Sequence, residues 1–278
     1  MLIGVDVGGT KIAAGLISDS QISHVIEFPV KSRASRKHVI EQICSAISAL
    51  GVRGVTAIGV CVPSVVDSRT GKIISTKNIP ALNNIAIASV LKKRFKRPVF
   101  VHNDAKAFAL SQVRRGEKDV VGLIVGTGIG AGVVVDGNVL VGARGGAGEI
   151  GSILTADGKS LEYHLAGPAF NRRFRMSGKA LFERASLGDK KALLAFKEYG
   201  ASFATLLSIL TLMYEPSRIV IGGSVATSSK FFLPTALSTL RKMHVNSKIP
   251  TVSAAIHAYP GILGAAHLCV IAKKAKHY

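Results

Sequence analysis

Apolar residues along the chain form two patterns, short continuous or alternating runs and longer stretches with helical spacing. The short runs, which predict strands, are 4–7, 12–17, 21–30, 55–62, 98–101, 120–125, 131–135, a further position near Val139, and 218–221. The stretches with helical spacing, which predict helices, are 36–50, 85–95, 105–113, 190–214 and 262–272. The segment 63–80 is expected to be a long loop. Strands that alternate with helices in this way predict an α/β fold.

The first two predicted strands meet at a Gly-Gly pair (8–9) within the sequence GVDVGGTKIAAGLI, residues 4–17. Glycine reaches the positive φ values that tight hairpin turns need, and such a turn leaves backbone N–H groups uncovered. Thr10 adds a hydroxyl and Lys11 a cation, so the tip suits phosphate oxygens. Asp6 faces away from its apolar neighbours, where a carboxylate could hold Mg²⁺ through water. The alternative is an ordinary hairpin with an acid at its edge.

The same pattern recurs at 122–135, GLIVGTGIGAGVVV, with the glycine turn at 126–128. Two such hairpins in one chain indicate duplicated halves, each with a phosphate-binding tip. A cleft between the halves would let both tips hold one polyphosphate. A third glycine turn, at Gly222 and Gly223, follows a predicted strand. It either receives an adenosine or is a plain turn between a strand and a helix.

Polar side chains follow the strand that ends at residue 101. Asn103 and Asp104 lie directly before a predicted helix, so Asp104 is most simply its N-cap. Ligands also bind at the carboxyl ends of strands in such sheets, and a carboxylate there could take the proton of a hydroxyl that attacks a phosphoryl group. Glu149 lies in the glycine-rich loop 142–151, where a lone acid is usually solvated.

The composition is that of a folded protein: 278 residues, of which 48% are hydrophobic and 19% charged, predict one or two domains with a sizeable core. The cysteines Cys44, Cys61 and Cys269 lie far apart in apolar surroundings, which predicts buried thiols in a reducing compartment. No signal peptide is visible, and the longest apolar run, 206–213, is too short to span a bilayer. We therefore expect a cytoplasmic protein with no membrane partner.

The chain is strongly basic, because it contains 36 Lys and Arg residues but only 16 Asp and Glu residues, which gives a net charge of +20. Such an excess predicts attraction to polyanions. The basic clusters are 31–37, 92–97, 114–118, 171–175 and 273–276. They are spread over many predicted elements, with no nucleic-acid motif and only 6% aromatic residues for base stacking. A solvated basic surface is therefore the favoured interpretation, and no specific nucleic acid is expected as a partner.

Seven motifs resemble the ROK family (repressors, open reading frames, sugar kinases). They are VDVGGTK at 5–11, GVCVPSVVD at 59–67, HNDAKAFAL at 102–110, GTGIGAGVVVDG at 126–137, GGAGEIG at 145–151, LEYHLAGPA at 161–169 and IVIGGSVA at 219–226. The resemblance implies a two-domain actin-like, sugar-kinase ATPase fold of duplicated ribonuclease-H-like domains, with sugar and nucleotide in the cleft between them. The expected domains are 1–104 plus 262–278, and 105–261.

The resemblance also implies roles for residues at the matching positions. Asp104 would be the general base that deprotonates the acceptor hydroxyl, and Asp6 would assist Mg²⁺ through water, with ATP as co-substrate. The candidates for binding the sugar are Asn78, Asn103, Asp104, Glu149, Ser152 and Glu162. The candidates for binding the nucleotide and its phosphates are Gly8, Gly9, Thr10, Lys11, Gly126, Thr127, Gly128, Gly222 and Gly223.

The chain departs from the family pattern at Ser152, where the family typically has His after GEIG. That His usually joins three closely spaced cysteines on a structural zinc, and it also touches the sugar. No cysteine lies between Ser152 and Glu162, and His164 alone cannot supply four N or S ligands, so no structural zinc is expected. Ser64, in place of a frequent glycine, is a second change expected near the sugar. Both changes leave the identity of the sugar open.

The resulting hypothesis is an ATP-dependent sugar kinase that transfers the γ-phosphoryl group to a hexose hydroxyl, similar to glucokinase and hexokinase and with broad sugar use as one option. The alternatives are a polyphosphate-dependent glucokinase, which the positive charge would suit, an N-acetylhexosamine kinase or a fructokinase. A non-catalytic sugar sensor or polyanion-binding protein is a further alternative. The resemblance implies a homodimer. Because the first hairpin begins at residue 2, where family repressors have a helix-turn-helix ahead of it, a transcription factor is not expected.

Overall fold

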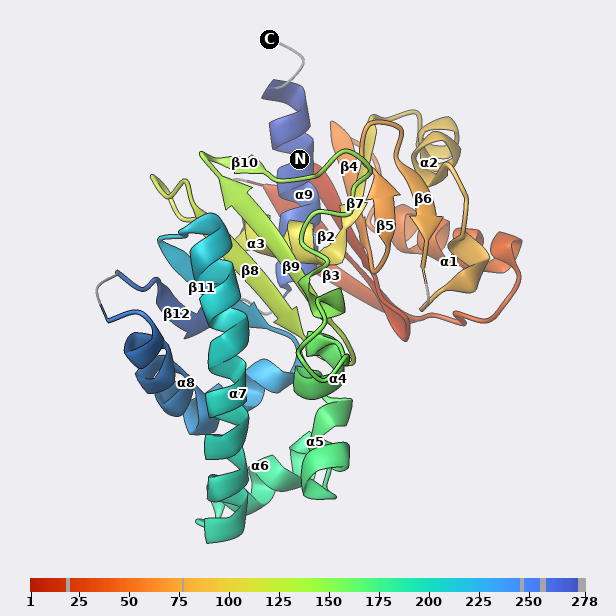
Figure 1. The fold of residues 1–278 in the computed structure, drawn as a ribbon. Coiled ribbons are helices and arrows are strands. Elements are labelled where there is room, and N and C mark those ends of the chain that lie inside the picture. The colour runs from red at the N-terminus through yellow and green to blue at the C-terminus, as the bar shows by residue number, and fades with distance from the viewer. Residues whose placement is uncertain (19–20, 77, 246–247, 256–258, 275–278) are drawn as a thin grey trace. The chain divides into compact units, whose positions relative to one another are not determined.

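Figure 1 shows a computed structural model of the chain, which describes residues 1–18, 21–76, 78–245, 248–255 and 259–274. The chain divides into two compact units. Unit 1 contains Met1–Gln112, Leu140–Ala147 and His257–Tyr278, and unit 2 contains Val113–Val139 and Gly148–Ile256. The units differ from the expected domains, since the helix that begins at Asp104 and the loop segment 140–147 both belong to unit 1. The reason is that this helix packs against the last helix of the chain and also holds the loop segment.

Unit 1 is built on a five-stranded sheet in the order β3-β2-β1-β4-β7. Its strands are β1 (Leu2–Val7), β2 (Lys11–Ser18), β3 (Gln21–Pro29), β4 (Ala57–Val62) and β7 (Val99–Asn103). The first three are antiparallel neighbours, whereas β4 runs parallel to β1 and β7 parallel to β4. The hairpin predicted at residues 8–9 is confirmed, because Val7 pairs with Ile12 across the turn.

Helices of unit 1 pack on both faces of this sheet. They are α1 (Arg36–Ala49), α2 (Ile87–Phe95), α3 (Asp104–Gln112) and α9 (Pro260–Lys274), with a short 3-10 helix η1 (Pro80–Leu82). Alternate strand residues point to opposite faces. The aliphatic residues, such as Val5 and Val60, join the core that α1 and α2 complete. The residues that alternate with them, Gly4 and Gly59, face α9.

The approach of α9 to the sheet is close enough to require glycine. A Cβ at Gly59 of β4 would lie 1.7 Å from the carbonyl oxygen of Ala265. On the other side of α9, a Cβ at Gly264 would lie 1.7 Å from the carbonyl oxygen of Ala107 in α3. Helix α9 is therefore held between β4 and α3 with no room for a methyl group at either contact, and the expected return of the last helix to the first half of the fold is confirmed.

The segment 63–80 is not the long loop that the pattern predicts, because it contains a two-stranded antiparallel sheet of β5 (Val65–Asp67) and β6 (Lys72–Ser75). Gly71 closes the turn between them with a positive φ of 66°. Strands of three and four residues are too short to show an alternating pattern, which explains why sequence periodicity missed them.

Unit 2 repeats this plan with a sheet in the order β10-β9-β8-β11-β12. Its strands are β8 (Val120–Val125), β9 (Ile129–Val135), β10 (Asn138–Val139), β11 (Arg218–Gly222) and β12 (Thr251–Ala254). Its helices are η2 (Ile150–Ser152), α4 (Leu161–Leu165), α5 (Pro168–Phe174), α6 (Gly178–Ser186), α7 (Lys190–Tyr214), η3 (Ser224–Ser228) and α8 (Ser229–Met243). An antiparallel hairpin followed by parallel strands recurs in both units, which confirms an α/β fold with two related halves.

Helix α7 forms much of the core of unit 2. Phe196, Tyr199 and Phe203 are fully buried on its inner face, and Tyr199 donates a hydrogen bond to the carbonyl oxygen of Leu165 at 2.6 Å. With 25 residues, α7 is long and apolar enough to cross a membrane by length and composition alone, which corrects the expectation that no apolar segment has that length. Half of its most apolar window is buried inside the protein, however, as in the core helix of a folded domain.

An ion pair between a buried arginine and a partly buried glutamate joins the start of unit 2 to β11. The Arg218 guanidinium, only 6% exposed, donates to both carboxylate oxygens of Glu117 at 2.9 and 2.5 Å. These hydrogen bonds lower the pKa of Glu117 from its ordinary value of 4.5. The stabilisation is therefore fully present above pH 4.5 and is lost as the pH falls through the lower pKa of the folded state.

We expect Glu117→Gln to lower the free energy of unfolding by about 2–3 kcal/mol, because it leaves the buried guanidinium without its carboxylate. Urea denaturation at pH 7 and pH 3 measures this. The difference between the variant and the natural chain should shrink at pH 3, which is below the ordinary pKa of 4.5, because proton binding to Glu117 in the unfolded chain then favours unfolding. Glu183→Gln, at an exposed position on α6, is the control. A difference that is the same at both pH values would contradict the role of this ion pair.

Candidate functional site

The predicted site residues divide between the two units. Unit 1 holds Asp6, Gly8, Gly9, Thr10, Lys11, Asn78, Asn103 and Asp104. Unit 2 holds Gly126, Thr127, Gly128, Glu149, Ser152, Glu162, Gly222 and Gly223.

The junction of β7 and α3 places Asp104 at the carboxyl end of a strand, as the sequence predicted. Asn103, and not Asp104, provides the N-cap of α3. Its Oδ1 accepts from the backbone N–H groups of Ala105 at 2.9 Å and Lys106 at 3.2 Å, and its amide donates to the carbonyl oxygen of Ser64 at 3.2 Å. Asp104 is already the first helical residue, with its Oδ1 2.8 Å from the N–H of Ala105. The predicted capping role of Asp104 is therefore wrong, and the cap fixes the helix on which this carboxylate lies.

Asp6 and Asp104 lie near the same buried thiol. Cys61 of β4 donates through its Sγ to Oδ1 of Asp6 at 3.4 Å. Burial raises the pKa of Cys61 well above its ordinary value, and the charges of Asp6 and Asp104 raise it further. Burial also raises the pKa of Asp6, against the lowering effects of the Cys61 hydrogen bond and of Lys11. The ends of β1 and β7 thus bring the predicted metal-assisting carboxylate and the predicted general base to one part of unit 1.

These two carboxylates suit Mg²⁺, which is commonly held by one or two carboxylates together with substrate phosphates and water. No group of three or more His, Cys, Asp or Glu side chains that could hold a metal is found among the residues that the structure describes. The side chains of Asp6 and Asp104 therefore suit a Mg²⁺ ion that is also bound by the phosphate oxygens of the nucleotide better than an ion held by the protein alone.

The tip of the first hairpin differs from the expectation, because neither Gly8 nor Gly9 has a positive φ. The N–H of Gly8 donates to the carbonyl oxygen of Lys11 at 2.9 Å. Asn78 lies against the tip, since a Cβ at Gly9 would be 3.4 Å from the Cβ of Asn78. Lys11 forms an ion pair with Glu27 at 2.6 Å, and this hydrogen bond raises the pKa of Lys11. A phosphate at this tip would therefore compete with a carboxylate for the Lys11 ammonium.

The tip of the second hairpin meets α4 in unit 2. Glu162, in the first turn of α4, accepts through Oε2 from the N–H of Ile129 at 2.9 Å. A Cβ at Gly128 would lie 2.6 Å from the same oxygen. The carbonyl oxygen of Gly126 accepts from Gly167 at 2.6 Å. A predicted sugar-binding acid and a predicted phosphate-binding turn are thus neighbours, which their separation in sequence did not show.

The glycine turn after β11 lies beside this second hairpin. Gly223 has a φ of 83°, and a Cβ there would be 2.4 Å from the carbonyl oxygen of Val125. A Cβ at Gly126 would be 3.8 Å from Oγ of Ser224. The two predicted nucleotide-binding turns of unit 2, at 126–128 and 222–223, are therefore neighbours.

The loop before α4 runs along β9. Glu149 and Ser152 are both exposed at the ends of η2, with the N–H of Ser152 donating to the carbonyl oxygen of Glu149 at 3.1 Å. The carbonyl oxygen of Gly148 accepts from the N–H of Ala131 at 2.9 Å, so the loop is tied to the strand just before Glu149. The two glutamates that are expected to bind sugar are thus attached to β9, Glu162 through its side chain and Glu149 through the backbone of the preceding residue.

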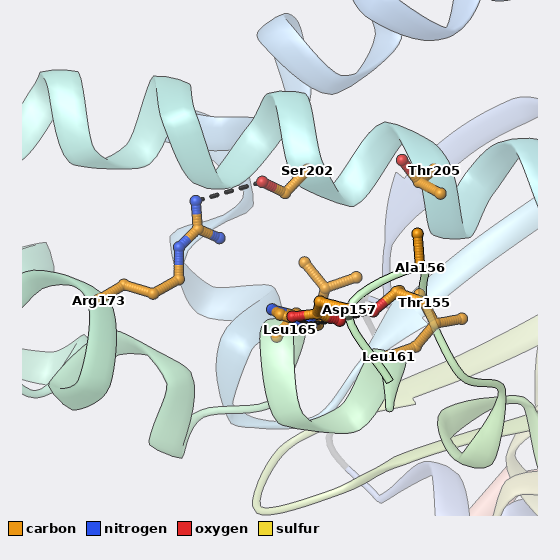
Figure 2. Close-up of a pocket in the computed structure, with 9 residues that line it drawn as sticks. Thr155, Ala156, Asp157, Leu161, Leu165, Arg173, Ser202 and Thr205 are labelled. Atoms are coloured by element: carbon orange, nitrogen blue, oxygen red, sulfur yellow. Dashed lines mark hydrogen bonds and ion pairs between the residues drawn. The ribbon is translucent and has the colours of Figure 1, made fainter. Parts of the chain in front are cut away.

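A pocket of about 460 Å³ lies between this region and the long helix of unit 2 (Figure 2). It is lined by Thr155, Ala156, Asp157, Leu161, His164, Leu165, Arg173, Ser202 and Thr205. None of the predicted site residues lines it. Figure 2 shows Arg173 of α5 reaching toward Ser202 of α7, with a distance of 3.2 Å between Nη2 and Oγ.

Asp157 ties the turn 154–160 to α4 at this pocket. It accepts from the hydroxyl of Thr155 at 2.5 Å and lies 3.1 Å from Nε2 of His164, and chiefly the Thr155 hydrogen bond lowers its pKa to about 2. This turn occupies the positions where the family pattern has its cysteines. Sequence analysis did not identify Asp157, because a single Asp beside Gly is the ordinary composition of a turn.

Comparison with known proteins gives consistent results. The model of the ROK family matches residues 2–271. The chain is 27% identical to an N-acetyl-D-glucosamine kinase from Photobacterium profundum, over 96% of this chain and 99% of that protein. It is similar to the crystal structure of a ROK hexokinase from Thermus thermophilus, with a TM-score of 0.83, 30% identity and 99% of each chain covered. It is also similar to a ROK family glucokinase from Streptomyces griseus in complex with glucose and AMPPNP, with a TM-score of 0.81, 25% identity and 96% and 98% of the chains covered.

Proposed function

The chain belongs to the ROK family and is a sugar kinase, and we propose that it transfers the γ-phosphoryl group of ATP to a hydroxyl of a hexose. The observation that carries this proposal is the position of Asp104. Its carboxylate lies at the carboxyl end of β7 on a helix that Asn103 caps, and its charge, like that of Asp6, raises the pKa of Cys61. The Streptomyces griseus glucokinase, whose structure contains the ATP analogue AMPPNP, supports ATP as the donor.

In the proposed reaction, Asp104 accepts the proton of the sugar hydroxyl as that oxygen forms its bond to the γ-phosphorus. The bond from the γ-phosphorus to the leaving oxygen of ADP breaks at the same time. Mg²⁺, held near Asp6 through water, would neutralise charge on the phosphates. The chain's own contribution is to orient the hydroxyl and remove its proton.

The proposed sugar contacts are made by carboxylates and amides in fixed positions. Glu162 has one oxygen held by the N–H of Ile129, so its orientation toward sugar hydroxyls is set before the sugar arrives. Glu149 and Ser152 would add contacts from the neighbouring loop. A site built to bind hydroxyls in this way discriminates strongly against analogues that lack one, because a buried acceptor is then left unpaired.

We expect Mg-ATP-dependent phosphorylation of glucose, measured by a coupled ADP-release assay across a panel of hexoses and N-acetylhexosamines. One relative is named an N-acetyl-D-glucosamine kinase and one structural neighbour a glucokinase. The sugar panel therefore decides between an N-acetylhexosamine and a hexose as the substrate. A higher kcat/KM for an N-acetylhexosamine than for glucose would replace the hexose proposal with that alternative. Turnover of none of these sugars would contradict the proposed substrate class.

Inorganic polyphosphate is a second candidate donor, which one surface feature favours. A hollow of about 540 Å³ at the end of α2 is lined by Ser89, Lys92, Lys93, Lys96, Arg97 and Pro98, four of which are basic and none acidic. Such a surface attracts polyanions at low salt. Competition between ATP and polyphosphate at several salt concentrations separates the two donors, because only a polyphosphate-dependent rate should fall when these lysines are changed to Gln.

A further inference from the structure

Lys106 is a buried lysine two residues after Asp104 on α3. It is 1% exposed, and its ammonium donates to the carbonyl oxygens of Gly145 at 3.1 Å and Ala147 at 2.7 Å. An ammonium is costly to bury unless its donors find acceptors. Lys106 therefore ties the loop to α3 at two points, Gly145 and Ala147. The start of α3 is in turn fixed by the Asn103 cap.

The loop is shaped to receive this side chain. Gly145 is buried with a φ of 79°, and a Cβ there would lie 2.1 Å from the carbonyl oxygen of Val66. The N–H of Gly145 donates to the carbonyl oxygen of Gly142 at 3.2 Å, and that of Ala147 donates to Val141 at 3.1 Å. Only glycine brings the backbone this close to β5, which places the two carbonyl oxygens within reach of Lys106.

The loop 140–147 lies just before Glu149 in the chain, so its contact with Lys106 bears on the position of that residue. Residues 140–147 pack as part of unit 1, whereas the chain on either side, 113–139 and 148–256, belongs to unit 2. Glu149, a proposed sugar ligand, comes two residues after Ala147. Gly148, between the loop and Glu149, is tied to Ala131 of β9, so the chain before Glu149 is held both by β9 and, through the loop, by Lys106.

His102 lies four residues before Lys106, near the end of β7. It is buried on β7, its Nδ1 has no hydrogen-bond partner among the residues that the structure describes, and its pKa is lowered to about 4, mainly by burial and further by the charge of Lys106. A neutral imidazole adds no second positive charge beside the buried ammonium.

We propose that Lys106 is a positioning residue, which holds the loop 142–147 on α3 and thereby sets the position of Glu149 for sugar binding. The inference rests on the proposed role of Glu149 in the kinase reaction. A single helix then carries the general base at its first residue and, two residues later, the anchor of the loop that precedes Glu149.

Lys106→Met in the full-length chain tests this proposal, because Met keeps most of the apolar length and removes the three donors. We expect the KM for the sugar to rise about 10-fold or more, with the KM for ATP within about 2-fold. Lys106→Arg, which keeps a charged donor, should recover part of the sugar affinity. Gln112→Met is the matched control, since Gln112 is also buried on α3; it should leave the sugar KM unchanged.

Hydrogen exchange of the loop amides makes the inference independent of activity. Protection of residues 142–147 should fall in Lys106→Met and not in Gln112→Met. Unchanged protection in Lys106→Met, or equal rises in both KM values, would overturn the proposal. Loss of protection in a chain that phosphorylates no sugar would instead show that Lys106 anchors the loop and that the proposed function fails. If Lys106→Met does not fold, Gly145→Ala, whose added methyl group would lie 2.1 Å from the carbonyl oxygen of Val66, displaces the same loop and should show the same loss of protection and rise in the sugar KM.

Discussion

Asp104→Asn is expected to lower kcat by about 10²–10⁴-fold, while the KM for the sugar changes by less than about 3-fold. Asn keeps the size of the side chain and its ability to accept a hydrogen bond from Ala105, but it cannot accept the proton of the sugar hydroxyl. The interaction that is lost therefore belongs to the transition state and not to the bound substrate. Steady-state kinetics with the best sugar of the panel measures both parameters.

The pH dependence provides a second readout. If Asp104 is the general base, the natural chain loses activity as the pH falls through the pKa of this carboxyl group, and the residual activity of Asp104→Asn should lack that step. Asp136→Asn, at an exposed turn in unit 2, is the control and should behave as the natural chain. Equal losses of sugar affinity and turnover in Asp104→Asn would show that the carboxylate serves the structure and not proton transfer.

Gly59→Ala is expected to lower the free energy of unfolding by at least about 3 kcal/mol, the upper end of the usual effect of overpacking. The added methyl group would lie 1.7 Å from a main-chain oxygen of Ala265. No side-chain rotation relieves a clash with backbone, so α9 must move away from β4. Thermal or urea unfolding of the variant measures the effect.

Gly146→Ala is the matched control for this substitution. A Cβ at Gly146 meets no atom within 4 Å, and its φ is not positive. The change should leave stability the same or raise it slightly, because Ala restricts the unfolded chain. A similar effect of the two substitutions would contradict the close packing of α9. If Gly59→Ala loses stability and Gly146→Ala does not, the kinase activity of Gly59→Ala is also expected to fall, because α9 packs against α3, the helix that carries Asp104.

Several elements were predictable because the signals that specify them are local. The two hairpins follow from glycines placed between apolar runs, and α7 begins and ends where the helical spacing does, at Lys190 and Tyr214. The position of Asp104 after β7 was also visible, since a polar pair between a strand and a helix is a contiguous pattern. The short strands β5 and β6 were missed because three or four residues carry too little periodicity.

The assignment of the helix cap shows the limit of local reasoning. Asn103 and Asp104 are both good N-cap residues, and the choice between them depends on where β7 ends. Pairing with β4 extends β7 through Asn103, which leaves Asp104 as the first residue of α3. A neighbour in the sheet, distant in sequence, therefore decided which of two adjacent side chains caps the helix.

The sequence by itself determined the α/β class, the two glycine hairpins and the residue types that suit phosphoryl transfer, because periodicity, turn chemistry and motifs are properties of contiguous residues. Only the tertiary structure decided that Glu162 meets the turn at Gly128, that Asn78 lies against Gly9 and that Lys106 binds the loop at Gly145. Each of these contacts joins segments tens of residues apart, and each depends on burial and on the exact path of the backbone. Such contacts form only when the sheets and helices have packed, so no local sequence pattern predicts them.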